Sequence, residues 1–209
     1  MNVRILVVAC FRPSDPQFRG MGRMVAETGW PAGCRAVPWN GRPLRLAGRK
    51  TLRSLLLLGH GATDAARIGD GGERFLSPDR LSLPREAGLY LIGCSQGRGG
   101  IASQWARGAG LAQERVFGCG GETESLLSTL LVAAVRFRGP DGLEAAFRDW
   151  RLLNDIARPW FPEARALYAA CGGKPGPVLS FYARRIDLAP FRAFLAPTGE
   201  RPEYFSDLM

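Results

Sequence analysis

Short apolar runs recur along the first 120 residues, separated by polar, glycine-rich and proline-rich segments. They cover residues 3–10, 55–58, 89–92 and 115–119. The runs at 55–58 and 89–92 are apolar at every position, which is typical of strands buried on both faces rather than of strands with one face in water. Because helix-length segments separate most of the runs, the pattern predicts an α/β fold with a mostly parallel central sheet.

The remaining pattern predicts a few helices and some smaller elements. Residues 66–76 indicate a β-hairpin around the turn Asp70-Gly71-Gly72, and Ser77-Pro78-Asp79 is typical of the start of a short helix. Helices are expected at 20–28, 101–108, 123–137 and 143–157, and strands at 35–37 and, late in the chain, at 178–186. No repeat or linker divides the sequence, so we expect one domain over residues 1–209, with a loose polar tail at 197–209.

Composition narrows the class of protein. With 209 residues, 46% hydrophobic and 22% charged, the chain is neither disordered nor collagen-like. It is long enough to bury a core without disulfides or a metal, and its five widely spaced cysteines include no Cys-x-x-Cys pair. The longest apolar run, 126–135, is too short for a membrane span, and 5–10 is too short for a signal-peptide core. We therefore expect a cytoplasmic protein with no cofactor, no metal and no membrane partner.

The charge distribution gives only a weak indication of a binding partner. The 28 basic residues against 19 acidic ones leave a net charge of +9, and no acid occurs between Glu27 and Asp64. A nucleic acid or an acidic partner could bind the basic residues at 35–53, but Trp39 is the one aromatic residue in that stretch and no nucleic-acid module matches. The pattern favours a solvated basic surface, and nucleic-acid binding is the alternative. The basic residues are Arg35, Arg42, Arg45, Arg49, Lys50 and Arg53.

Two of the apolar runs end in a reactive side chain flanked by glycine. His60 follows the run at 55–58 within Gly59-His60-Gly61, and Cys94 follows the run at 89–92 after Gly93. Because the carboxyl ends of parallel strands meet at one edge of a sheet, we expect the thiol and the imidazole at the same edge. They form a candidate nucleophile and base. His60 is the only histidine, which excludes mechanisms that need two imidazoles.

Three other motif interpretations fail on the residues. The string at 93–97 fits G-x-S-x-G with Ser95 as nucleophile, but no histidine follows it in the chain, as that triad requires. A cysteine-phosphatase loop needs an arginine six positions after the cysteine, where this chain has Gly100. A phosphate-binding P-loop needs Gly-Lys-Ser/Thr, and neither lysine occurs in such a string. The Cys94/His60 dyad is the hypothesis that remains.

The order strand-His-Gly, hairpin, short capped helix, strand-Gly-Cys resembles the caspase-like cysteine peptidases of clan CD, which include caspases, separases and bacterial CHAT-domain peptidases. Leu58-Gly59-His60-Gly61 matches their His-Gly signature, and the string at 91–95 is similar to the separase and CHAT form of the cysteine strand. The resemblance covers residues 50–135. It implies a caspase-like three-layer α/β/α sandwich with a mostly parallel central sheet and a small β-hairpin insertion.

The same resemblance implies roles for individual residues. Cys94 is the nucleophile, His60 protonates the leaving amine, and the backbone N–H groups of Gly61 and Cys94 form the oxyanion hole. Ile92 stands where caspases carry Gln and metacaspases Asp, so it supplies no polar contact to substrate. Separases bind a substrate arginine with an acid in the loop after the next strand, where this chain has Glu122 and Glu124.

These acids leave two alternatives open. Either Glu122 or Glu124 binds an Arg or Lys side chain of the substrate, or both acids favour a helix N-terminus and an apolar pocket floored by Ile92 accepts Leu or Met. The resemblance implies a cysteine endopeptidase that cleaves a protein or peptide, in bacterial defence or regulated proteolysis, with a neighbouring effector protein as one conceivable partner. The alternative from another class is a catalytically idle scaffold of the same fold.

Overall fold

The computed structural model describes residues 2–191, which form two compact units. The first unit contains residues up to Asp15 and Val25–Thr123, and the second contains Pro16–Met24 and the chain from Glu124 onward. The chain passes between the units at Asp15–Pro16, Met24–Val25 and Thr123–Glu124. The tail expected at 197–209 lies outside the described residues.

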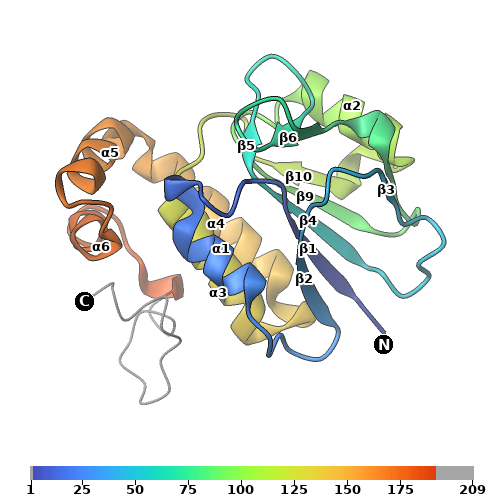
Figure 1. The fold of residues 1–209 in the computed structure, drawn as a ribbon, viewed down its shortest axis with the longest axis horizontal. Coiled ribbons are helices and arrows are strands. Elements are labelled where there is room, and N and C mark those ends of the chain that lie inside the picture. The colour runs from blue at the N-terminus through green and yellow to red at the C-terminus, as the bar shows by residue number, and fades with distance from the viewer. Residues whose placement is uncertain (1, 192–209) are drawn as a thin grey trace. The chain divides into compact units, whose positions relative to one another are not determined.

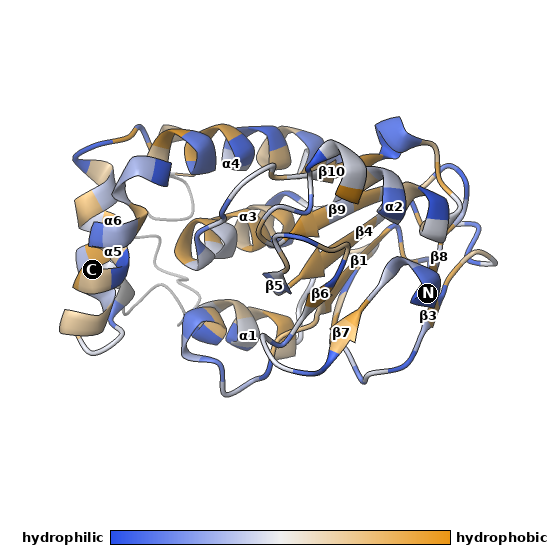
Figure 2. Cartoon of the chain, turned by 90° about the horizontal axis from the view of Figure 1, so that it is seen from above, coloured by the Kyte–Doolittle hydropathy of each residue, from blue (hydrophilic) through white to orange (hydrophobic). Residues whose placement is uncertain are grey.

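The first unit is built on a five-stranded sheet in the order β10-β9-β4-β1-β2, in which every neighbouring pair is parallel (Figure 1). This confirms the predicted α/β class with a mostly parallel central sheet. The strands are β1 (Ile5–Ala9), β2 (Cys34–Pro38), β4 (Ser54–Leu58), β9 (Gly88–Ile92) and β10 (Val116–Gly118). All five residues of β9 are buried, as the unbroken apolar run predicts, and Figure 2 shows β1, β4 and β9 as hydrophobic strands.

Several smaller elements complete the first unit. The predicted hairpin is confirmed: β6 (Ile68–Gly69) pairs antiparallel with β7 (Phe75–Leu76), and β5 (His60–Gly61) adds a third strand. Proline begins the short helix η2 (Pro78–Arg80), as predicted. The other elements are β3 (Leu44–Arg45), β8 (Leu81–Ser82), α2 (Gly99–Ala109) and η3 (Gln113–Arg115).

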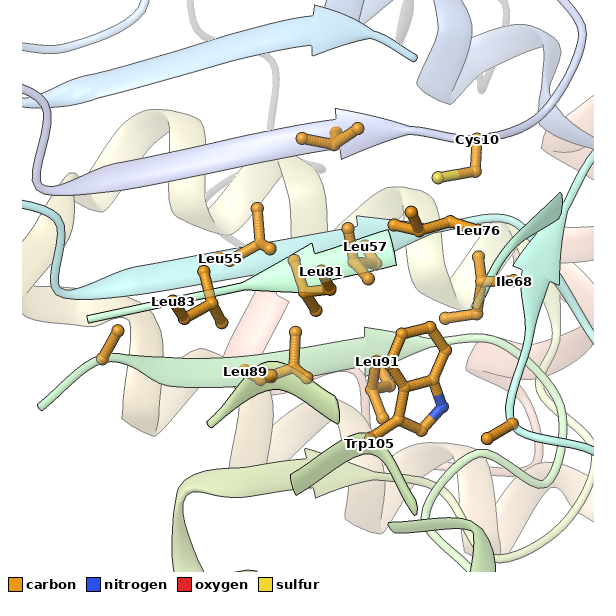
Figure 3. Packing of buried hydrophobic residues seen from close by; sticks show 14 of the residues in the cluster. Cys10, Leu55, Leu57, Ile68, Leu76, Leu81, Leu83, Leu89, Leu91 and Trp105 are labelled. Atoms are coloured by element: carbon orange, nitrogen blue, oxygen red, sulfur yellow. The ribbon is translucent and has the colours of Figure 1, made fainter. Parts of the chain in front are cut away.

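A cluster of buried aliphatic side chains fixes these elements on one face of the sheet. Leu55 and Leu57 of β4 and Leu89 and Leu91 of β9 project alternate side chains into it, and Trp105 of α2 packs with them (Figure 3). Further members are Val8, Cys10, Ile68, Leu76, Leu81 and Leu83. Each buried aliphatic side chain contributes roughly 1.5–3 kcal/mol, so the hairpin and α2 are firmly held beside the loops after β4 and β9.

The second unit is helical. It comprises η1 (Pro16–Phe18), most of α1 (Arg19–Ala26), α3 (Ser125–Arg138), η4 (Pro140–Gly142), α4 (Leu143–Ala157), η5 (Arg158–Trp160), α5 (Phe161–Ala170), α6 (Pro175–Ala183) and η6 (Ala189–Phe191). The helices predicted at 20–28, 123–137 and 143–157 are confirmed within about two residues. Within residues 2–191, no helix has the length and apolar character that crossing a bilayer requires.

The late strand predicted at 178–186 is wrong, because most of that segment forms α6. The buried side chains Val178, Leu179 and Tyr182 are spaced as on one face of a helix. The helix begins at Pro175, and proline is favoured in the first turn of a helix because its missing N–H has no partner there. Pro175 therefore indicated the helix more reliably than the approximate alternation of apolar and polar residues at 178–186 indicated a strand.

Candidate functional site

The strands β4 and β9 bring His60 and Cys94 to the same edge of the sheet. Leu58 of β4 pairs with Ile92 of β9, and each reactive residue stands two positions beyond its member of that pair. Beyond the ladder, the N–H of Gly59 still donates to the carbonyl of Ile92 at 3.2 Å. Parallel register therefore places the imidazole and the thiol on neighbouring loops at the carboxyl edge.

Gly61 brings the two loops into direct backbone contact. A Cβ atom at this position would lie 2.3 Å from the carbonyl oxygen of Cys94 and 2.6 Å from its nitrogen, so only glycine fits without a shift of the backbone. Gly93 meets the same loop, since its Cβ would lie 3.1 Å from the nitrogen of Gly61. The two residues whose N–H groups are candidates for the oxyanion hole are thus held against each other.

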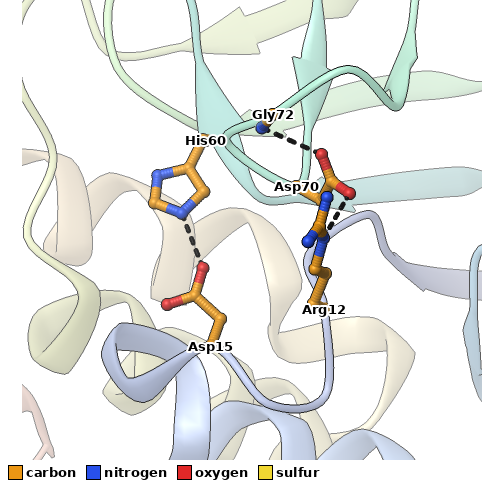
Figure 4. A network of polar contacts seen from close by, with 5 residues as sticks. All are labelled: Arg12, Asp15, His60, Asp70 and Gly72. Carbon is orange, nitrogen blue, oxygen red and sulfur yellow. Dashed lines mark hydrogen bonds and ion pairs between the residues drawn. The ribbon is translucent and has the colours of Figure 1, made fainter.

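The imidazole of His60 is bound on one edge and packed on its side (Figure 4). Its Nε2 lies 2.7 Å from Oδ2 of Asp15, with the His60 side chain 32% and the Asp15 side chain 13% exposed. The hairpin turn packs against the ring, because a Cβ at Gly71 would lie 2.9 Å from the ring Cδ2. Gly71 has a φ of 78°, which glycine adopts without strain, so the turn approaches the ring as closely as a backbone can.

An ion pair joins the loop that carries Asp15 to the same hairpin turn. Arg12 donates from Nε to Oδ2 of Asp70 at 2.7 Å, and Oδ1 of Asp70 accepts the N–H of Gly72 at 3.0 Å. The Asp70 side chain is only 4% exposed. The hydrogen bond from Arg12 holds the pKa of Asp70 below its usual value, so the pair is ionised at neutral pH.

The sulfur of Cys94 lies against Thr123, the last residue before the second unit. The N–H of Thr123 donates to Sγ at 3.4 Å, and the Thr123 hydroxyl oxygen lies 3.7 Å from the same atom. Ser95, with a φ of 60°, turns the chain sharply after the cysteine and donates its N–H to the carbonyl of Gly121 at 2.7 Å. Thr123 therefore contacts the sulfur of Cys94 through both its backbone N–H and its hydroxyl group.

Gln96 joins the histidine loop, the cysteine loop and α2 through one buried amide. It is completely buried, and its Nε2 donates to the carbonyl of Ala62 at 2.7 Å and to that of Cys94 at 3.1 Å. Its Oε1 accepts the indole N–H of Trp105 at 2.8 Å. The amide also donates to the carbonyl of Ala65 at 3.2 Å and accepts the N–H of Arg67 at 3.1 Å. Gln96 therefore fixes the spacing of the two loops.

The candidate specificity residues Glu122, Glu124 and Ile92 differ in exposure and in contacts. Glu122 is exposed in the loop after β10, in the same unit as Cys94. Glu124 belongs to the second unit and caps α3, with Oε2 accepting the N–H of Leu127 at 2.8 Å. Desolvation raises the pKa of Glu124 to about 7. Ile92 is 2% exposed. Glu124 therefore caps a helix, as the second of the two alternatives expected. Binding of a basic substrate side chain stays a prediction for Glu122.

The five thiols differ in accessibility. Cys10, Cys34 and Cys119 are buried, whereas Cys94 and Cys171 are half-buried, and within residues 2–191 none of the five forms a disulfide. Desolvation raises the pKa of Cys10 to about 12, which makes that thiol inert at neutral pH. Within the described part of the chain, no three His, Cys, Asp or Glu side chains are grouped as ligands for a metal ion.

Comparison with known proteins adds no relative: no protein-family model matches the chain, and neither a curated protein nor a solved structure is significantly similar to it. The residues themselves carry the functional argument. Sequence reasoning missed Asp15, Gln96 and Thr123. Asp15 did have a signal, because it is an acid in the loop that follows another buried parallel strand and so belongs to the same sheet edge.

Proposed function

We propose that this protein is a cysteine endopeptidase of the caspase-like type, with Cys94 as nucleophile and His60 as its acid–base partner. The observation that carries the proposal is the register of β4 and β9, which places both residues two positions beyond the paired Leu58 and Ile92. The backbone contact of Gly61 with Cys94 supports it, because it assembles two candidate oxyanion donors at the nucleophile.

In the proposed reaction the thiolate of Cys94 attacks the carbonyl carbon of the cleaved bond. A C–S bond forms, and the carbonyl π electrons move onto oxygen, where the N–H groups of Gly61 and Cys94 bind the oxyanion. The oxyanion collapses and the C–N bond breaks as His60 gives its proton to the leaving amine. Water, deprotonated by His60, then attacks the acyl-enzyme and releases the acid and the Cys94 thiolate.

Selective labelling of Cys94 tests this proposal. We expect a peptide acyloxymethyl ketone to modify Cys94 at least about 10²-fold faster than Cys171, which is also half-buried, because general acid–base action typically contributes about 10²–10⁴-fold. Peptide mapping by mass spectrometry measures both rates. The Cys94→Ala variant serves as the blank and Cys171→Ala as the matched control. Equal labelling of Cys94 and Cys171 by the peptide reagent contradicts the proposal.

Glu122 is the acid that we propose selects the substrate. If it binds the side chain before the cleaved bond, Arg is preferred over Lys, because a planar guanidinium donates two parallel hydrogen bonds to a carboxylate. Glu122→Gln should lower kcat/KM on arginine substrates by about 10-fold or more, the equivalent of about 1.4 kcal/mol, and leave leucine substrates unchanged.

The matched control is Glu114→Gln, which neutralises another exposed acid of the first unit. A peptide library profiled on the wild type and both variants measures the preference. If the wild type prefers Leu or Met, or if its basic preference survives in Glu122→Gln, the assignment of Glu122 is wrong.

A further inference from the structure

We propose that Asp15 is a positioning residue for His60, and that the Arg12–Asp70 ion pair holds Asp15 in place. Asp15 accepts the Nε2 proton of the imidazole, so that Nδ1 is the nitrogen that exchanges protons with substrate. The role of Nδ1 in proton exchange rests on the proposed peptidase function. The orientation of the His60 ring by Asp15 does not, and it can be measured without following catalysis.

The first argument is the contact between the two side chains. Nε2 of His60 and Oδ2 of Asp15 are 2.7 Å apart, and the Asp15 side chain is 13% exposed. A carboxylate accepts and does not donate, so Nε2 carries the hydrogen in this pair whether the ring is neutral or charged. The fixed tautomer presents Nδ1 with a lone pair when the ring is neutral and with a proton when the ring is charged.

The second argument is the packing of the ring. The turn at Gly71 lies against the imidazole, which restricts its rotation on the side where a Cβ would lie 2.9 Å away. Arg12, three residues before Asp15, donates to Asp70, and Asp70 accepts the N–H of Gly72 in the same turn. The loop that carries Asp15 and the turn that packs on the ring are therefore joined, and His60 lies between them (Figure 4).

The test uses the fact that His60 is the only histidine in the chain. With ¹⁵N-labelled histidine, NMR should show a slowly exchanging, downfield Nε2–H signal in the wild type. The signal should be lost in Asp15→Ala, and in Asp15→Asn it should move upfield because the acceptor is no longer charged. Arg12→Gln should broaden the same signal, since Asp15 is then less firmly held. Asp64→Asn, which changes an exposed acid in the loop after β5, should leave it unchanged.

Kinetics give the second readout. Asp15→Asn should lower kcat by about 10²-fold with little change in KM, because the imidazole is then less well oriented toward the substrate that Cys94 attacks. A wild-type Nε2–H signal that persists in Asp15→Ala overturns the positioning role. If the signal behaves as expected but Cys94 is not labelled selectively, the positioning role stands and the peptidase proposal fails.

Discussion

Replacing Gly61 with alanine should lower peptide turnover by at least about 10²-fold, although neither His60 nor Cys94 is changed. The added Cβ would lie 2.3 Å from the oxygen and 2.6 Å from the nitrogen of Cys94. These are backbone atoms of the loop after β9, so the clash is relieved only if the two loops move apart. Removing one oxyanion donor typically costs about 10²–10³ in kcat, and separating two candidate donors should cost no less.

Stability and activity distinguish this effect from general unfolding. We expect Gly61→Ala to lose about 1–3 kcal/mol of unfolding free energy, as is usual when a well-packed site is overfilled, and to remain folded at 25 °C. The matched control is Gly99→Ala in the first turn of α2, where a Cβ meets no atom within 4 Å. That variant should keep full turnover. Wild-type turnover by Gly61→Ala contradicts the proposed oxyanion hole.

The parts of the fold that could be predicted are those encoded by unbroken local patterns. The apolar runs at 55–58 and 89–92 predicted buried strands, and their order with the hairpin and η2 predicted that His60 and Cys94 meet at one edge of the sheet. Both reactive residues were therefore within reach of sequence reasoning. Their register was not, because β4 and β9 are apolar on both faces and the pattern alone does not fix how they pair; the structure supplies the pairing of Leu58 with Ile92.

What could not be predicted depends on contacts between distant residues. Asp15 is 45 positions from His60 and Thr123 is 29 from Cys94, and no local pattern records such pairs. The α6 helix was mistaken for a strand because its apolar residues are so dense that two-residue and helical spacings both fit. The sequence around Gln96 does not indicate that its side chain is buried, because that burial depends on contacts with Trp105 and with the loop that carries His60.

The buried amide of Gln96 leads to the prediction with the largest expected effect on stability. In Gln96→Leu, the indole N–H of Trp105 and the N–H of Arg67 lose their acceptor, and the carbonyl of Ala62 loses its donor. Each buried polar group left unsatisfied costs about 1–3 kcal/mol, so we expect a loss of roughly 3–5 kcal/mol. Urea unfolding measures it. Gln104→Leu, on the exposed side of α2, is the matched control and should change stability by about 0.5 kcal/mol or less.

Gln96→Glu refines the same prediction through its pH dependence. The substituted side chain keeps the shape of glutamine, but burial opposes its ionisation and raises its pKa in the folded state above the value of about 4.3 in the unfolded chain. The unfolded state then releases the proton first as pH rises, so the unfolding free energy should fall with pH above about 4.3, by up to about 1.4 kcal/mol per pH unit. The wild type, with a neutral amide at this position, lacks that contribution. If Gln96→Glu and the wild type follow the same pH dependence, the side chain at 96 is in contact with water and the two loops are not joined through it.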